Sequence, residues 1–131
     1  MSGYTIKRLE EVGDVLGDYP GEMRLLTRPL ENEQVAITFR RMPQFSGGKG
    51  SHGHYHRTQE ELYYVISGHL QFKLDDAVIE VEGGTAVRCA PSTVRSIWND
   101  EPEDGHLLII STRLPDDAPE DAVLVEDFWP E

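Results

Sequence analysis

Three histidines at alternate positions are the residues of this chain most able to do chemistry. His52, His54 and His56 are three of its five histidines, and Glu61 follows shortly after them. A β-strand points every second side chain to the same face, so a strand here would present three imidazoles together. The apolar run after Glu61 is aromatic and β-branched, which predicts a neighbouring strand. Two such strands can bring two or three imidazoles and one carboxylate together, a ligand set for a divalent transition metal that leaves positions open for water or substrate.

Short strands make up most of the rest of the chain. Residues 34 to 42 alternate with the period of a half-buried strand, with Val35, Ile37 and Phe39 on one face, and residues 69 to 82 indicate a hairpin. Turns recur roughly every eight to twelve residues without a long helix, a spacing typical of an antiparallel sandwich or barrel. We expect one domain over 1–131, with a core at 23–112, an N-terminal segment at 1–22 and a C-terminal tail at 113–131. The tail is acidic and then aromatic, and we expect its aromatic end to be docked.

The histidine stretch resembles the first sequence motif of the cupin superfamily, Gly-x5-His-x-His-x3–4-Glu-x6-Gly. The matching positions are Gly48, His54, His56, Glu61 and Gly68. The second motif of that superfamily, Gly-x5-Pro-x-Gly-x2-His-x3-Asn, is matched in part. Its positions are Gly84, Ala90, Pro91, Ser92, Arg95 and Asn99. The resemblance implies an all-β, single-domain cupin-type jelly-roll β-barrel with an internal pocket, and it names no reaction because this fold hosts many functions.

Arg95 stands where the second motif has the histidine that would be a third imidazole ligand. A guanidinium is always charged and has no lone pair, so it does not bind a metal in place of imidazole. Two arrangements follow. In the first, His54, His56 and Glu61 hold a divalent metal (Fe, Mn, Ni, Cu or Zn) and Arg95 binds an anionic ligand nearby. In the second, Arg95 forms a bidentate pair with Glu61, and the pocket is metal-free.

Two further residues are candidates for ligand binding. Tyr63 shares the face of Glu61 by alternation and could orient a ligand, although core packing explains it equally well. His52 is more typical of a pocket rim than of a metal ligand. Two classes of function remain open. One is a metal-dependent oxygenase, isomerase or decarboxylase acting on a small molecule; the other is a non-enzymatic module that binds or senses a small anionic ligand.

Composition narrows the range of partners. The net charge is −12, with 24 acidic residues against 12 basic ones. Such a chain repels nucleic acid and anionic membrane, so we exclude both as partners. A single cysteine, Cys89, and the lack of a signal-peptide pattern indicate a cytoplasmic protein. Leu62, Tyr64 and Ile66 should form an outward apolar strip on their strand, and a strip of this kind predicts a homodimer.

Overall fold

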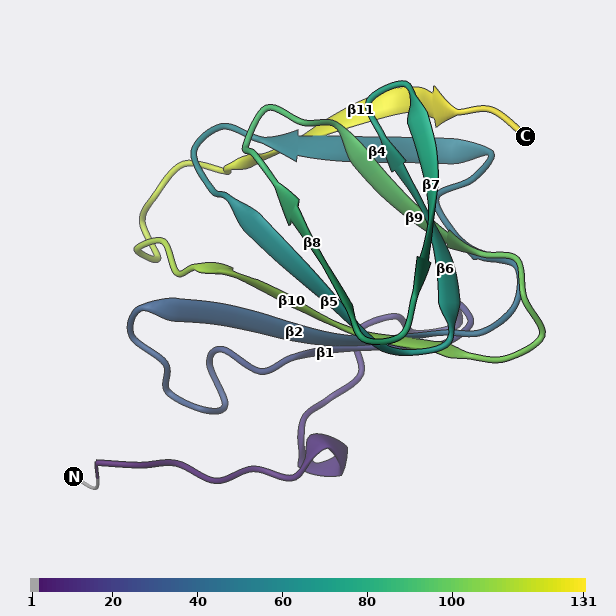
Figure 1. Ribbon diagram of the computed structural model, residues 1–131. Coiled ribbons are helices and arrows are strands. Elements are labelled where there is room, and N and C mark those ends of the chain that lie inside the picture. The colour runs from purple at the N-terminus through teal and green to yellow at the C-terminus, as the bar shows by residue number, and fades with distance from the viewer. Residues whose placement is uncertain (1–2) are drawn as a thin grey trace.

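The computed structural model describes residues 3–131, and its regular secondary structure is almost entirely β-strand (Figure 1). A single 3₁₀ turn, η1 (Leu9–Glu11), precedes them. The strands are β1 (Glu22–Leu25), β2 (Val35–Met42), β3 (Ser46–Gly47), β4 (Ser51–His56), β5 (Glu61–Ser67), β6 (His69–Leu74), β7 (Ala77–Glu82), β8 (Thr85–Cys89), β9 (Arg95–Asn99), β10 (Gly105–Thr112) and β11 (Ala122–Trp129). Within residues 3–131, no helix is long and apolar enough to cross a membrane.

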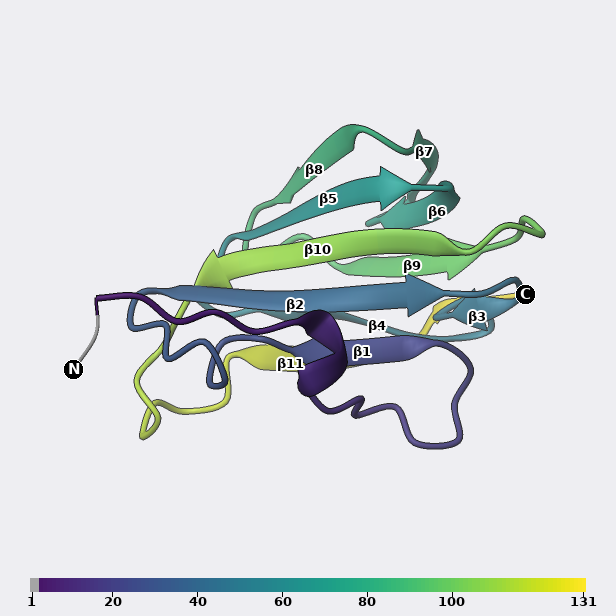
Figure 2. The same cartoon turned by 90° about the horizontal axis from the view of Figure 1, so that it is seen from below.

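The strands form two antiparallel sheets that face each other, as the two perpendicular views show (Figures 1 and 2). One sheet has the order β1-β2-β10-β5-β8, which we call sheet A. The other, sheet B, has the order β11-β4-β9-β6-β7, with β3 also paired to β9. The β4–β5 connection crosses from sheet B to sheet A, so the histidine strand and the Glu61 strand face each other across the barrel. The all-β jelly-roll prediction is therefore confirmed.

The core lies between the sheets and is formed by alternate residues of the facing strands. On β5, Tyr63 and Val65 are buried, whereas Leu62, Tyr64 and Ile66 are 38%, 39% and 46% exposed. The predicted alternation of β5 is thus confirmed. The buried cluster consists of Met42, Tyr63, Val65, Leu70, Phe72, Val81, Cys89, Ile97 and Leu107.

Strand β2 shows that an alternating pattern does not reveal which face is inside. The more apolar face, which carries Val35, points away from the barrel, and Val35 is 47% exposed. The opposite face carries Arg40 and Met42, of which Met42 is buried in the core and Arg40 lines an internal cavity. Burial is decided here by the pairing of β2 with β1 and β10, which turns Arg40 toward the other sheet.

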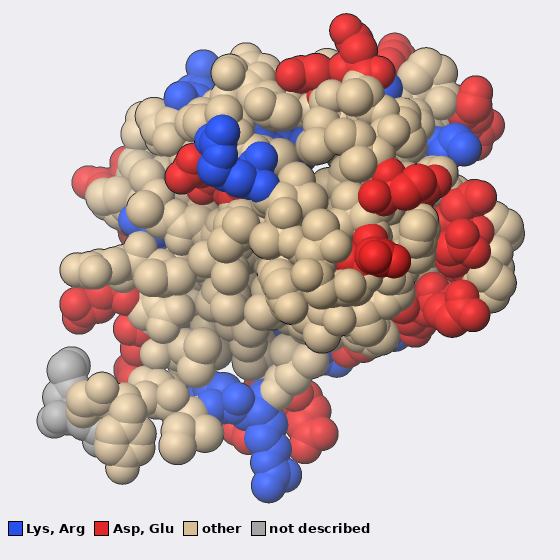
Figure 3. All heavy atoms as spheres, in the orientation of Figure 1, with Lys and Arg blue, Asp and Glu red and all other residues tan. Residues whose placement is uncertain are grey.

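The C-terminal segment is docked, and it extends sheet B beyond the expected core range. Strand β11 pairs with β4, and Trp129 is only 5% exposed. The Lys73 ammonium lies 3.8 Å from the centre of the Phe128 ring, in a cation–π contact. Gly53 makes this docking possible, because a Cβ there would collide with the Phe128 ring. Acidic side chains outnumber basic ones on the face shown in Figure 3, consistent with the net charge of −12.

Candidate metal centre and cavity

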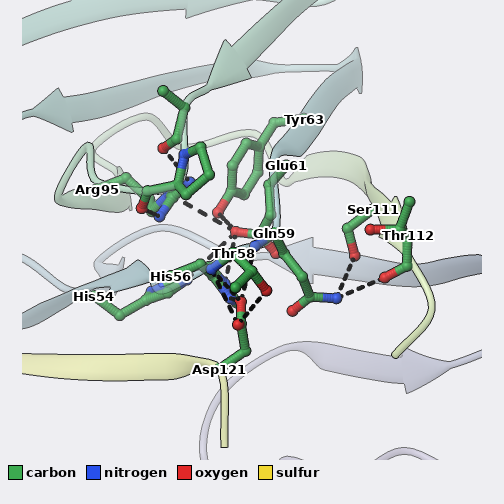
Figure 4. Close-up of polar contacts among 12 residues, drawn as sticks. His54, His56, Thr58, Gln59, Glu61, Tyr63, Arg95, Ser111, Thr112 and Asp121 are labelled. Carbon is green, nitrogen blue, oxygen red and sulfur yellow. Dashed lines mark hydrogen bonds and ion pairs between the residues drawn. The ribbon is translucent and has the colours of Figure 1, made fainter. Parts of the chain in front are cut away.

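His54, His56 and Glu61 converge at one point inside the barrel (Figure 4). Each offers one ligand atom, and these atoms all lie within 4.8 Å of one another. The Glu61 Oε1 atom is 3.4 Å from His54 Nε2 and 3.3 Å from His56 Nε2. The two histidines come from β4 in sheet B and the carboxylate from β5 in sheet A, so the cluster exists only because the sheets face each other.

These separations fit the donor set of a divalent transition metal. Ligand atoms bound at about 2.1 Å in a tetrahedral arrangement lie roughly 3.4 Å apart, close to the two nitrogen–oxygen distances in the cluster. Two imidazole nitrogens and one carboxylate oxygen suit Fe, Mn, Ni, Cu or Zn, and the open cavity beside them leaves room for further ligands. The three residues could therefore hold such a metal without a change of fold.

Asp121, the residue just before β11, orients His56. The Asp121 carboxylate lies 3.1 Å from His56 Nδ1 and also accepts hydrogen bonds from the Thr58 and Gln59 backbone N–H groups and the Thr58 hydroxyl. Burial alone would raise the pKa of Asp121, but these hydrogen bonds outweigh it and lower the pKa to about 2. An ionised carboxylate only accepts, so Asp121 favours a proton on Nδ1 of His56, the tautomer whose Nε2 can bind a metal beside Glu61. Partners of this kind commonly orient metal-binding histidines.

Tyr63 holds the Glu61 carboxylate in place. Its hydroxyl donates a 2.6 Å hydrogen bond to Glu61 Oε1. Burial raises the pKa of Glu61, but the hydrogen bonds with His54 and Tyr63 and the neighbouring imidazoles lower it to about 2. Burial raises the pKa of Tyr63, and the Glu61 charge raises it further. Glu61 is therefore a carboxylate and Tyr63 a neutral donor, and the prediction that the two share a face is confirmed.

Arg95 is 1% exposed and lies at the edge of the same cluster. Its two terminal nitrogens donate long hydrogen bonds of 3.4 and 3.3 Å to the Pro91 and Ala90 carbonyls of the preceding turn. Its Nε is 3.7 Å from Glu61 Oε1 and has no hydrogen-bond partner. The guanidinium thus stands within ion-pair range of Glu61 without making the two parallel hydrogen bonds of a bidentate pair.

A cavity of about 300 Å³ opens beside the cluster, at the low end of small-molecule sites, which are roughly 300–1,000 Å³. His54, Glu61, Tyr63 and Arg95 line it together with apolar side chains of both sheets. His52 lines it as well, but it is exposed and outside the cluster of ligand atoms. Its Nδ1 lies 3.1 Å from the Ser51 hydroxyl, so it stands at the rim.

Two residues of this region were missed by the sequence reasoning. Asp121 follows a polar, acidic stretch and has no motif; the pairing of Ala122 with His56 alone brings it to the site. Arg40 lines the cavity from β2. The sequence indicated Arg40 only through the alternating pattern of β2, and that pattern is compatible with either face of the strand being buried.

The matching sequence family agrees with this architecture. Residues 44–111, just over half of the chain, match the family model described as a cupin domain. The chain therefore belongs to the cupin family. No curated protein matches it.

Solved structures with this fold have different described activities. An uncharacterised Klebsiella pneumoniae protein with a double-stranded β-helix domain has a TM-score of 0.70 at 17% identity, covering 93% of this chain and 97% of that one. A predicted oxalate decarboxylase from Thermotoga maritima has a TM-score of 0.67 at 20% identity, covering 84% and 100%. A candidate sugar phosphate isomerase from Acidithiobacillus ferrooxidans has a TM-score of 0.61 at 23% identity, covering 72% of this chain and 60% of that longer one. At these identities the likeness shows the fold alone.

Proposed function

We propose that this protein binds a divalent transition metal through His54, His56 and Glu61 and a small anionic organic ligand in the adjoining cavity. The observation that carries the proposal is the convergence of three ligand atoms within 4.8 Å at the wall of a cavity of about 300 Å³. Burying a carboxylate or an imidazole inside a barrel costs free energy unless the group is hydrogen-bonded, paired or bound to a cation. The metal could be Fe, Mn, Ni, Cu or Zn, since affinity discriminates weakly among them.

The surrounding residues have distinct parts in this proposal. Asp121 keeps the Nε2 lone pair of His56 directed at the site, and Tyr63 fixes the oxygen of Glu61 by its hydrogen bond. Arg95 presents an unpartnered buried Nε that can bind an oxyanion of the ligand. His52 stands at the rim, where it can contact the outer part of the ligand. When bound, the metal supplies Lewis-acid polarisation of a ligand oxygen.

If the protein is an enzyme, this arrangement suits an oxygenase, isomerase or decarboxylase acting on a small molecule. One structural neighbour is described as a predicted oxalate decarboxylase and another as a candidate isomerase, which supports this range without selecting a reaction. The second candidate is a metal-free binding or sensing module in which Arg95 neutralises Glu61. Its support is the 3.7 Å approach of Arg95 Nε to the Glu61 carboxylate.

Metal titration tests the proposed function. Protein purified without a nickel resin and stripped with a chelator is titrated calorimetrically with Mn, Fe(II), Ni, Cu and Zn at neutral pH. We expect tight binding of one ion per chain for at least one metal, and loss of that binding in His54→Ala and Glu61→Gln. His69→Ala is the matched control, because His69 pairs with Glu80 on the surface. Failure of the wild type to bind any of these metals would contradict the proposal.

We further propose that the protein is a cytoplasmic homodimer. The outward strip of β5, formed by Leu62, Tyr64 and Ile66, is 38–46% exposed on the outer face of sheet A. Covering apolar area of this kind is favourable by about 25 cal/mol per Å². The single cysteine, Cys89, is free and buried, which is compatible with a reducing compartment.

A further inference from the structure

Arg40 is a half-buried cation with no hydrogen-bond or ion-pair partner among residues 3–131. It lies on the inner face of β2, opposite Met23 of β1 and Leu107 of β10. Its Nε is buried without a hydrogen-bond partner, and its side chain has no ion pair within residues 3–131. The next residue, Arg41, makes the contrast clear, because its guanidinium pairs with Glu22 at 2.6 Å and with Asp104 at 3.1 Å.

The surroundings of Arg40 do not compensate its charge. Burial lowers the pKa of Arg40, and the ionisable side chains near enough to oppose this effect are two tyrosines, Tyr19 and Tyr63. An arginine nevertheless stays charged in proteins. Removing such a charge from water without a partner is unfavourable, and an anion bound in the cavity beside Arg40 would offset that cost.

The charges around the cavity point to an anion with more than one charged group. Two guanidiniums line the cavity, Arg40 from sheet A and Arg95 from sheet B, each with a buried and unpartnered Nε. Glu61 is the single carboxylate among the lining residues; Tyr63 and both cluster histidines contact it, and Arg95 Nε lies 3.7 Å from it without a hydrogen bond. In a chain with a net charge of −12, this cavity therefore carries an excess of positive charge before any metal is added.

The apolar residues of the cavity limit the rest of the ligand. Met23, Ile97 and Ile109 line it together with the two arginines. A volume of about 300 Å³ admits a small molecule only. The lining thus suits a short carbon skeleton in contact with apolar side chains and charged groups directed at the two sheets.

We propose that the ligand is a small organic dianion, in the first instance a short dicarboxylate, with one carboxylate bound by Arg40 and the other at the Arg95 end of the cavity. This deepens the proposed function and rests on its ligand cavity. Arg40 is then a specificity-determining residue, since a planar guanidinium binds a carboxylate through two parallel hydrogen bonds. Ligands with a single anionic group leave one of the two guanidiniums unpaired and bind more weakly.

Matched probes test this assignment. Malonate, succinate and glutarate are titrated calorimetrically into the full chain, each against the monocarboxylate of equal carbon number, in zinc-loaded and in chelator-treated protein. We expect at least one dicarboxylate to bind tenfold or more tightly than its monocarboxylate partner. Arg40→Met should remove that preference, with a loss of about tenfold to a hundredfold, the usual range for a hydrogen bond to a charged group. Arg40→Lys should show a preference between those of the wild type and Arg40→Met, because lysine keeps the positive charge but cannot make the two parallel hydrogen bonds of a guanidinium.

The matched control is Arg88→Met, which removes the same charge from an exposed pair with Glu60 and should leave the preference unchanged. Thermal melting of the ligand-free proteins gives a second readout. Because Arg40→Met replaces an unpaired, half-buried charge by an apolar side chain of similar length, its melting temperature should equal or exceed that of the wild type.

Three results would overturn the assignment: no preference for any dicarboxylate, a preference that survives Arg40→Met, or a marked fall in the melting temperature of ligand-free Arg40→Met. The zinc titration separates this failure from failure of the proposed function. Intact zinc binding without an Arg40-dependent preference refutes the dianion alone. Dicarboxylate binding through Arg40 in protein that takes up no metal refutes the metal site alone.

Discussion

Asp121→Asn should weaken both the fold and the metal site, because this one carboxylate ties the start of β11 to the end of β4 and the turn after it. Asp121 accepts from the Thr58 hydroxyl at 2.6 Å, from the Gln59 N–H at 2.9 Å and from His56 Nδ1 at 3.1 Å. An amide of the same shape keeps part of this network but loses the negative charge. It also no longer requires the His56 proton to stay on Nδ1.

The size of the stability effect follows from the pKa of Asp121. The usual value is 3.8, and burial raises it, but hydrogen bonds from Thr58, Gln59 and His56 hold it at about 2 in the folded chain. The difference between the two values corresponds to at most about 2.5 kcal/mol of unfolding free energy at neutral pH. Because the folded-state pKa is the lower one, this contribution is complete above about pH 4 and is lost as the pH falls through about 2.

Urea unfolding in the presence of a chelator measures this contribution. We expect Asp121→Asn to lower the unfolding free energy by about 1–2 kcal/mol at pH 7, and the difference from wild type to shrink steadily between pH 4 and pH 2. Asp117→Asn is the control, since Asp117 is an exposed residue of the preceding loop. Metal titration of the same variant should show roughly tenfold to a hundredfold weaker binding, the usual effect of removing the partner of a metal-binding histidine.

The reasoning would be refuted if Asp121→Asn matched the wild type in unfolding free energy at pH 7 and in metal affinity. A uniform loss of stability at every pH would refute the electrostatic part of it. In that case the network would act by packing, and the Asp121 charge would contribute nothing measurable.

Three further predictions concern other parts of the chain. Arg95→His adds an imidazole and removes a fixed charge. If Arg95 neutralises Glu61 in the wild type, calorimetry should show a sharp gain in metal affinity. If the wild type already holds a metal, the metal affinity should change little and anion binding should be damaged. Deletion of residues 123 to 131 removes most of β11 and exposes the surface under Trp129, so the melting temperature should fall by the equivalent of a few kcal/mol; an unchanged melting curve would contradict the docking. Tyr64→Lys places a charge in the outward strip of β5, so sedimentation at micromolar concentration should show a dimer for the wild type and a monomer for the variant; a monomeric wild type would exclude the dimer.

The local chemistry of the site could be predicted from the sequence because strand geometry is periodic. Alternation places His54 and His56 on one face of a strand whatever lies around it, and the same rule unites Glu61 with Tyr63. The turn at Gly68 was also predictable from the sequence, and its backbone φ of 91° is one that favours glycine. Spacing along the chain therefore sufficed for the all-β fold and for the candidate metal ligands.

Only the tertiary structure decided which further residues reach the site. Asp121 lies 65 positions from His56 in the chain, and it contacts His56 because β11 pairs with β4. Arg40 faces the cavity because the pairing of β2 turns its more apolar face outward. Periodicity indicates that two faces differ but not which of them is inside, since burial depends on the strands that pair and pack against each face. The orienting carboxylate and the second guanidinium therefore emerged only when the two sheets were placed against each other.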